Sequence, residues 1–301
     1  MNRVLISGVL MLAVSFNLAA AGAEIVPAPQ KWEPGTETLE LETTDLSYYF
    51  VEKPNPNNIF ALNQLIIFWE ANQALRLTPG TRGKADLLVG KLGIFDKLDE
   101  AFRQEDIDQI GEEGYIISVT ADRIFVGAHT DAGVFYGIQT LRQYMMPYRD
   151  RKIPTLYLAD WPDFKLRAWQ DDALSKGAPE TDYIKDQIKK FAQFKLNGLV
   201  FETNPVLPKN VIDELNRFAG LYHVKLFFNE KPAGELQEAV IQAKDRIWPD
   251  LRGLNYEIKD AVAKAKESGA AQFLLRTSDE NYFGFFESFY LPVIWGGVNL
   301  W

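Results

Sequence analysis

The sequence contains no cysteine and only two histidines, His129 and His223. The lack of cysteine excludes disulfide bonds, thiolate metal sites and cysteine nucleophiles. With only two histidines, a multi-histidine metal centre is not expected either, and we predict no metal and no other cofactor. A chain of 301 residues with 47% hydrophobic residues must therefore be stabilised by its apolar core, and its length suggests two domains.

The chain also has fewer positively charged than negatively charged residues. The chain has 32 Lys and Arg residues against 41 Asp and Glu residues, which gives a formal net charge of −9. An acidic protein repels phosphate backbones and anionic lipids, so nucleic acid and anionic membranes are not expected partners.

The first residues have the pattern of an export signal. Arg3 is followed by a nearly continuous apolar run over residues 4–21, and Ala21-Gly22-Ala23 fits a signal-peptidase site. Polar, turn-rich sequence follows. We therefore predict a cleaved signal peptide over residues 1–23 rather than a stable membrane anchor, and an exported, periplasmic or extracellular protein.

Residues 24–158 are predicted to form an α/β unit. Apolar residues at helical spacing predict a helix over residues 58–75, and apolar runs predict strands over 86–89, 115–119, 123–127 and 153–158. The strands over 115–119 and 123–127 are predicted to form a hairpin across Ala121-Asp122. Thr130 is a predicted N-cap for a helix that contains Gly133 and Gly137. No glycine-rich phosphate motif accompanies these glycines, so we interpret them as positions where the helix packs closely on the sheet.

Residues 159–301 alternate between predicted helices and strands. We predict helices over 181–196, 210–221, 235–243 and 257–268, and strands over 199–201, 224–228 and 272–275. This alternation predicts a parallel sheet, whose ligands bind beyond the carboxyl ends of its strands. The segment before the first helix is interpreted as an extended lead-in that brings Arg167, Asp171 and Asp172 together.

Five stretches of the sequence carry a resemblance to a known family: residues 132–143, 160–167, 170–177, 194–197 and 267–279. Together they resemble glycoside hydrolase family 20, the β-N-acetylhexosaminidases. The helix over 132–143 is similar to the end of that family's non-catalytic N-terminal domain, which related hexosaminidase-like families share. Residues 160–167, Asp-Trp-Pro-Asp-Phe-Lys-Leu-Arg, resemble the start of the family's barrel, and Phe-Lys-Leu-Asn at 194–197 matches a recurrent family pattern. Residues 170–177 are similar to one bacterial branch. Residues 267–279 are similar to the last barrel strand but lack the tryptophan that usually precedes its Asp.

The resemblance implies a fold and a set of sugar contacts. The fold is an α/β one, in which an N-terminal α+β hexosaminidase-like domain precedes a (β/α) TIM-type barrel. Arg167 matches an arginine that holds sugar hydroxyls, although an ion pair with Asp171 or Asp172 is the alternative. The predicted substrate-binding residues, from the resemblance and from their places at strand ends, are Arg167, Asp172, Glu202 and Asp279.

The chemistry that the resemblance implies is substrate-assisted. In the family, the substrate's 2-acetamido oxygen attacks the anomeric carbon while an adjacent Asp-Glu pair on the fourth barrel strand orients it and protonates the leaving oxygen. Adjacent Asp-Glu residues occur here at 99–100, 213–214 and 279–280, none in that context. Because residues 159–301 are fewer than the ~200 that an eight-fold barrel needs, we predict that the barrel is internally shortened and lacks this pair.

Three functions remain open from the sequence. The first is an exported hexosaminidase that releases terminal N-acetylhexosamine from glycans by retaining hydrolysis. The second is a non-catalytic protein that binds N-acetylhexosamine-containing glycans or another partner. The third is an inactive deletion product, a pseudoenzyme in effect. In each case, uncovered barrel edges would favour oligomers.

Overall fold

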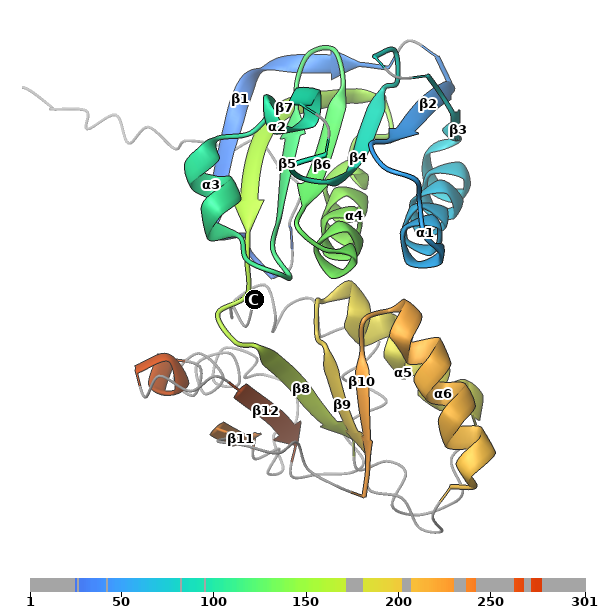
Figure 1. Ribbon diagram of the computed structural model, residues 1–301, viewed down its shortest axis with the longest axis vertical. Helices are drawn as coiled ribbons and strands as arrows, with labels where there is room; N and C mark the ends of the chain where they lie inside the picture. Colours follow the sequence, from blue (N-terminus) through green and yellow to red (C-terminus); the bar gives the residue numbers. More distant parts are fainter. Residues whose placement is uncertain are drawn as a thin grey trace, which may run out of the picture.

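The computed structural model describes residues 25, 27–41, 43–81, 83–94, 96–171, 181–201, 207–229, 237–241, 263–267 and 272–277. These residues form two units, each built on its own sheet, that lie end to end (Figure 1). The strand β7 leads from the first unit into the second. The mixed α/β class that the sequence predicts is confirmed.

The first unit is a seven-stranded sheet in the order β1-β7-β5-β6-β4-β2-β3. The strands β1, β7, β5 and β6 pair antiparallel, and β6, β4, β2 and β3 pair parallel. The predicted hairpin is confirmed as β5 and β6. The strands are β1 (Lys31–Glu40), β2 (Asp45–Phe50), β3 (Arg76–Pro79), β4 (Leu87–Lys91), β5 (Tyr115–Val119), β6 (Ile124–Ala128) and β7 (Lys152–Asp160).

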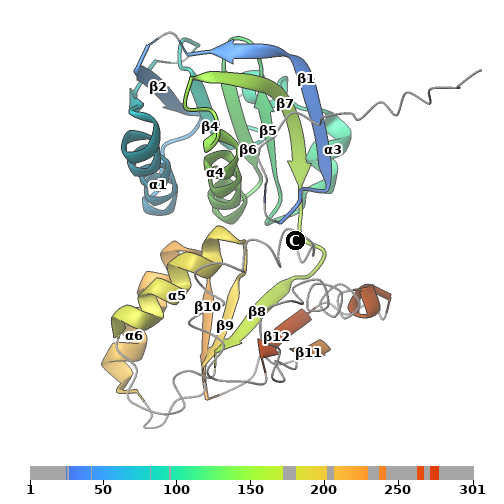
Figure 2. The same ribbon diagram turned by 180° about the vertical axis from the view of Figure 1, so that it is seen from behind.

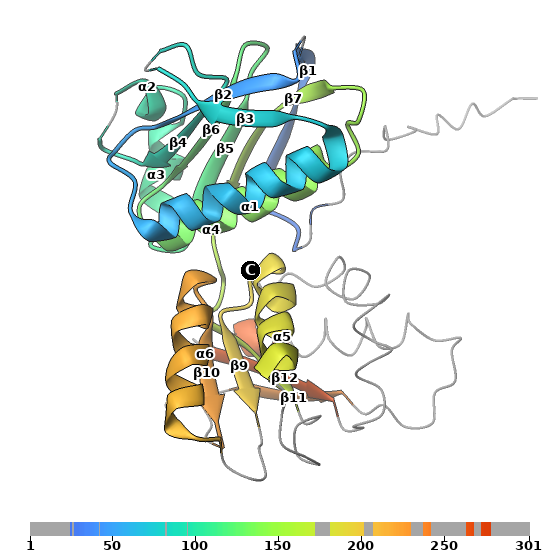
Figure 3. The same ribbon diagram turned by 90° about the vertical axis from the view of Figure 1, so that its right-hand side faces the viewer.

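Helices cover both faces of this sheet. The helices α1 (Pro56–Gln73) and α4 (Asp131–Met145) lie side by side on one face, and α2 (Asp96–Asp99) and α3 (Gln104–Gln109) lie on the other (Figure 3). The predicted cap of α4 is confirmed, since the Thr130 hydroxyl accepts a hydrogen bond from the Gly133 amide at 3.3 Å. The Asn55 side chain caps α1 in the same way.

The glycines of α4 allow it to lie directly on the sheet. A Cβ at Gly133 would overlap the Gly114 carbonyl and lie 2.7 Å from the Ala128 Cβ. A Cβ at Gly137 would lie 2.8 Å from a methyl group of Val126. The interpretation of these glycines as packing positions is therefore confirmed.

The second unit is a five-stranded, fully parallel sheet in the order β10-β9-β8-β12-β11. Two helices, α5 and α6, pack on one side of it (Figure 2), and Trp169 stacks on Phe191 across that contact at 5.5 Å. Strands followed by helices on one face are typical of (β/α) units. The elements are β8 (Leu166–Asp171), α5 (Thr181–Gln193), β9 (Gly198–Phe201), α6 (Lys209–Leu221), β10 (Lys225–Phe228), β11 (Gln237–Ile241) and β12 (Gln272–Thr277), with a short helical stretch over 263–267.

Two predictions for this unit are wrong. The lead-in at 166–171 is itself a strand, β8, and it lies at the centre of the sheet. The segment is short, contains two charged residues and has no β-branched side chain, so the sequence does not indicate a central strand there. The helix predicted over 235–243 is instead the strand β11, which pairs with β12. Pairing with a neighbouring strand overrides the local helical spacing there.

We expect Gly133→Ala to destabilise the protein by about 1–3 kcal/mol, because the added methyl group must push α4 away from the Gly114 backbone. Equilibrium urea unfolding measures the change. The matched control is Gly220→Ala in α6, where a Cβ meets no atom within 4 Å. That change should instead stabilise the protein by about 0.5–1 kcal/mol. Equal effects of the two substitutions would contradict the close packing of α4.

Candidate functional site

The two helices of the second unit end in the same way. In each, a left-handed residue follows the helix, Lys195 after α5 (φ 61°) and His223 after α6 (φ 56°). The next amide bonds back to the helix, from Leu196 to Phe191 and from Val224 to Ala219, both at 3.1 Å. Glycine usually occupies this left-handed position because it lacks a Cβ. Here both residues carry side chains that contact the first unit.

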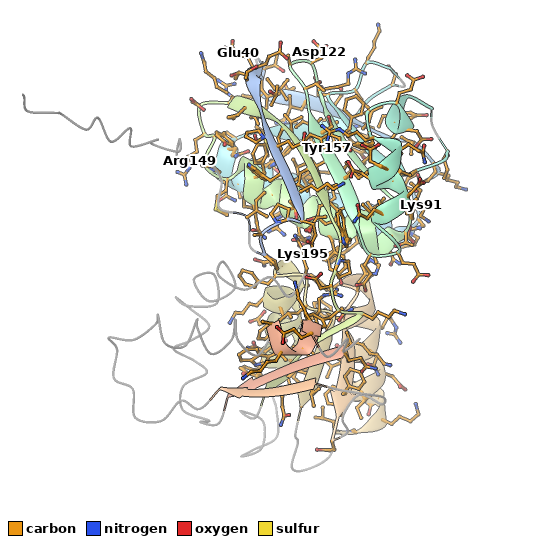
Figure 4. The ribbon with its side chains drawn as sticks, turned by 90° about the vertical axis from the view of Figure 1, so that its left-hand side faces the viewer. Glu40, Lys91, Asp122, Arg149, Tyr157 and Lys195 are labelled. Atoms are coloured by element: carbon orange, nitrogen blue, oxygen red, sulfur yellow. The ribbon has the colours of Figure 1, made fainter. Side chains whose placement is uncertain are left out.

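Lys195 makes a fully buried ion pair at the junction of the units (Figure 4). Its ammonium lies 2.8 Å from a carboxylate oxygen of Asp160, which ends β7, and donates to the Tyr115 hydroxyl at 2.7 Å. The Tyr115 hydroxyl also lies 2.6 Å from Asp160 and from Thr140. Each of these polar groups has a partner, which is the condition for burying them.

Burial shifts the proton affinities of this cluster. It raises the pKa of the Asp160 carboxyl, while the Lys195 ammonium acts in the opposite direction. It also raises the pKa of the Tyr115 hydroxyl well above its usual value, and the Asp160 charge adds to that rise. The tyrosine therefore remains a neutral donor to the carboxylate.

Arg167 lies beside this cluster, at the amino end of β8. Its guanidinium pairs with the Glu113 carboxylate at 2.7 Å and donates to the carbonyls of Phe164 at 2.6 Å and Lys195 at 2.9 Å. The side chain is only 1% exposed. The described ion pair thus joins Arg167 to the first unit, whereas the sequence suggested Asp171 or Asp172 as its partner. The sugar-binding role of Arg167 remains a prediction.

Asn197 completes the contact between the units. Its side-chain oxygen accepts from the Arg167 amide at 2.8 Å, and its side-chain nitrogen donates to the Glu113 carboxylate at 3.1 Å. Sequence reasoning did not find Glu113. The one local signal is its place in Glu112-Glu113-Gly114, a charged turn directly before the buried strand β5.

The other predicted contacts follow strands of the second sheet in the sequence. The register aligns Asp171 with Phe201, and Phe201 with Phe228, so the carboxyl ends of β8, β9 and β10 lie together. The rings of Phe201 and Phe228 stack there at 5.6 Å. Asp172 and Glu202 directly follow β8 and β9, and Asp279 follows β12 by two residues; all three lie outside the described residues.

The Asp-Glu pairs that the structure describes are on its surface. Asp99 ends α2 and accepts from the Gly93 amide at 3.0 Å. In α6, Asp213 pairs with Lys209 at 2.8 Å and Glu214 with Lys185 at 2.6 Å. Residues 213–214 thus lie on a solvated helix face, with side chains 52% and 55% exposed. The pair at 279–280 lies outside the described residues.

The described part of the chain contains no group of three or more His, Asp or Glu side chains arranged to hold a metal ion. None of the helices within that part has the length and apolar character of a membrane span.

Comparison with known families identifies the first unit. Residues 22–161 match the family model described as glycosyl hydrolase family 20, domain 2. The chain carries domain 2 of glycosyl hydrolase family 20. The match ends at Trp161, directly after Asp160, so this family domain itself supplies the carboxylate that pairs with Lys195.

Solved structures match the chain beyond this domain. The N-acetyl-β-hexosaminidase of Streptomyces plicatus is 16% identical with a TM-score of 0.54, over 92% of this chain and 64% of that one. The Flavobacterium johnsoniae chitobiase is 15% identical with a TM-score of 0.54, over 73% and 35%. The structure of CpGH84D is 17% identical with a TM-score of 0.57, over 86% and 45%. These likenesses show a shared fold, and this chain spans between about a third and two thirds of the relatives' length.

We expect Lys195→Met to destabilise the protein by about 3–5 kcal/mol, because it leaves the Asp160 carboxylate buried without its partner. Urea unfolding of the whole chain measures the change. Lys189→Met, in the exposed ion pair with Asp186 on α5, should cost at most about 1 kcal/mol. Adding Asp160→Asn to Lys195→Met should recover part of the loss. Equal costs for the two lysines would contradict the buried pair.

We expect the stability of the protein to fall as the pH drops from about 7 to 5, because His223 must gain a proton while buried. Its ring packs on Phe135 at 5.4 Å, and burial lowers its pKa, against the charges of Asp131 and Glu113. A folded-state pKa below the unfolded one favours the neutral form. The resulting stability is full above the unfolded pKa and is lost on acidification.

Thermal unfolding at several pH values measures this dependence. His223→Asn, which tolerates the left-handed backbone, should flatten it between pH 5 and 7. His129→Gln removes the other histidine of the chain and should leave the dependence intact. A slope that His129→Gln abolishes and His223→Asn preserves would contradict the assignment.

Proposed function

We propose that this protein is exported and recognises terminal N-acetylhexosamine on glycans, through the carboxyl edge of its second sheet. The observation that carries the proposal is the orientation of the two units. The family 20 domain 2 covers the amino ends of β8 and β9 through Asp160, Glu113 and their partners. Ligands of parallel sheets bind at the other edge, beyond the carboxyl ends.

The relatives supply the chemical class of the ligand. The Streptomyces plicatus protein is named an N-acetyl-β-hexosaminidase, and a mutant of it is described in complex with the product GlcNAc. On this chain, we propose Asp172, Glu202 and Asp279 as acceptors for sugar hydroxyl and amide groups, because each follows a strand of the parallel sheet. Carboxylates at such positions accept short, charge-assisted hydrogen bonds.

Arg167 has a different part in this proposal. Its guanidinium is held by Glu113 and by two carbonyls at the amino end of β8. We therefore propose that Arg167 positions β8, and through it Asp171 and Asp172, instead of contacting the sugar directly.

We also propose a signal peptide, a two-domain division and self-association for this chain. A signal peptide over residues 1–23 and export to the periplasm or the extracellular space fit a ligand that lies outside the cell. We propose one domain over 24–158 and a second, an incomplete barrel, over 159–301. Self-association through uncovered strand edges belongs to the same proposal.

Hydrolysis is the second candidate function, and one observation favours it. Asp279-Glu280 is the Asp-Glu pair of the chain that follows a strand of the parallel sheet, two residues beyond the end of β12. In substrate-assisted hydrolysis, the aspartate would orient the acetamido group and the glutamate would protonate the leaving oxygen. The pairs at 99–100 and 213–214 lie in surface helices and do not offer this arrangement.

Calorimetric titration of the full chain with N,N′-diacetylchitobiose tests recognition. We expect binding that Asp279→Asn weakens about tenfold, the usual effect of losing one charge-assisted hydrogen bond. Asp213→Asn, on the exposed face of α6, is the matched control and should leave affinity unchanged. No heat with the wild type, or the same loss in both variants, would overturn the proposal. Release of p-nitrophenol from its N-acetylglucosaminide, abolished by Glu280→Gln, would instead establish hydrolysis.

A further inference from the structure

A cavity lies in the first unit, far along the chain from the predicted sugar-binding residues. Its volume is about 390 Å³, within the range of small-molecule sites. It opens between the carboxyl ends of the parallel strands β2 and β3 and the first turns of α1. Its lining includes Tyr48, Phe50, Ile59, Leu62, Asn63 and Pro79.

One wall of the cavity is aromatic. Tyr48 and Phe50 alternate along β2 and therefore lie on the same face, which is the face that α1 covers. Their rings meet edge to face, with centroids 5.9 Å apart and planes at 81°. In this geometry the edge of one ring lies against a face of the other, and both side chains remain half-buried. A flat apolar ligand surface can stack on the ring faces that this contact leaves open.

The cavity presents one charged group. Glu52 is the one charged residue of its lining, and its two carboxylate oxygens each accept a hydrogen bond from a neutral donor. One accepts from the Asn58 side chain at 3.2 Å and the other from the Lys91 amide at 2.8 Å. The neutral amide of Asn63 lies exposed on α1 at the rim. A ligand that combines an apolar face with hydroxyl groups fits this lining, because hydroxyl groups donate hydrogen bonds to carboxylate and amide oxygens.

The apolar rim continues along α1. Ile59, Asn63 and Ile67 are spaced four residues apart and so share one side of the helix. The two isoleucines are 45% and 63% exposed, which is high for large apolar side chains on a helix packed against a sheet. This surface can contact a second ring beside the one in the cavity.

We propose that this cavity is a second glycan site, which takes one pyranose ring against Tyr48 and Phe50. Domain 2 would then bind the same glycan whose terminal sugar the second unit recognises. The choice of an N-acetylhexosamine ligand rests on the proposed function; the pyranose class rests on the lining itself. Asn63 is the specificity-determining polar contact, and the aromatic pair supplies the stacking surface.

The test uses the full chain and N,N′-diacetylchitobiose in calorimetric titrations. In an Asp279→Asn background, binding should persist at the domain 2 cavity. Asn63→Ala should weaken it about fivefold to tenfold without changing the melting temperature, because an exposed helix position tolerates alanine. The matched control is Asn72→Ala, another exposed asparagine of α1 outside the cavity, which should leave affinity unchanged. Tyr48→Ala should reduce affinity further by removing the stacking ring.

The outcomes separate this inference from the proposed function. If Asn63→Ala abolishes binding and Asp279→Asn does not, the result supports the cavity and contradicts the site at the carboxyl edge of the second sheet. If Asp279→Asn abolishes binding and Asn63→Ala does not, the result supports the carboxyl edge and contradicts the cavity. Equal affinities of the Asn63→Ala and Asn72→Ala proteins would overturn the second site. Binding of the apolar dye ANS by the Asp279→Asn protein with no binding of the sugar would also overturn it, since that result would assign an apolar surface.

Discussion

The ion pair between Asp160 and Lys195 determines how the two sheets meet. Neither charge can be buried alone without a cost of several kcal/mol, so each requires the other in position. Asp160 is the last residue of β7, and Lys195 follows α5, so their contact joins the end of one unit to the first helix of the next. Tyr115 and Thr140 satisfy the remaining polar atoms from the first unit.

This constraint explains two residues in unusual backbone conformations. A glycine at position 195 or 223 would relieve the left-handed backbone but would remove a side chain that contacts the first unit. The two positions are equivalent in successive helix–strand connections. Lys195 contributes charge and His223 contributes an aromatic contact with Phe135. The repeated helix ending thus serves as the docking surface for domain 2.

The sequence predicted those elements whose information is local. The cap at Thr130, the packing role of Gly133 and Gly137, and the hairpin depend on residues close in the chain, and all are confirmed. The strand β11 and the central strand β8 were missed because their identity depends on pairing with β12, which is distant in sequence from β8. Residue type and period alone do not encode such partners.

The residues of the candidate site also differ in whether local sequence is enough to predict their roles. The strand end at 199–201 can be read from the sequence and led to the prediction of Glu202, whereas Asp172 was predicted from the family resemblance. The partner of Arg167 was not predicted, because Glu113 belongs to a turn of the other unit and its role appears only when the sheets are docked. The four residues of β9 separate that docking edge from the opposite edge by roughly 10–13 Å. The contacts between the two units and the connections at the carboxyl ends of the strands can therefore diverge independently in evolution. Repeats and loops can be gained, lost or exchanged at the carboxyl ends while domain 2 remains docked at the amino ends.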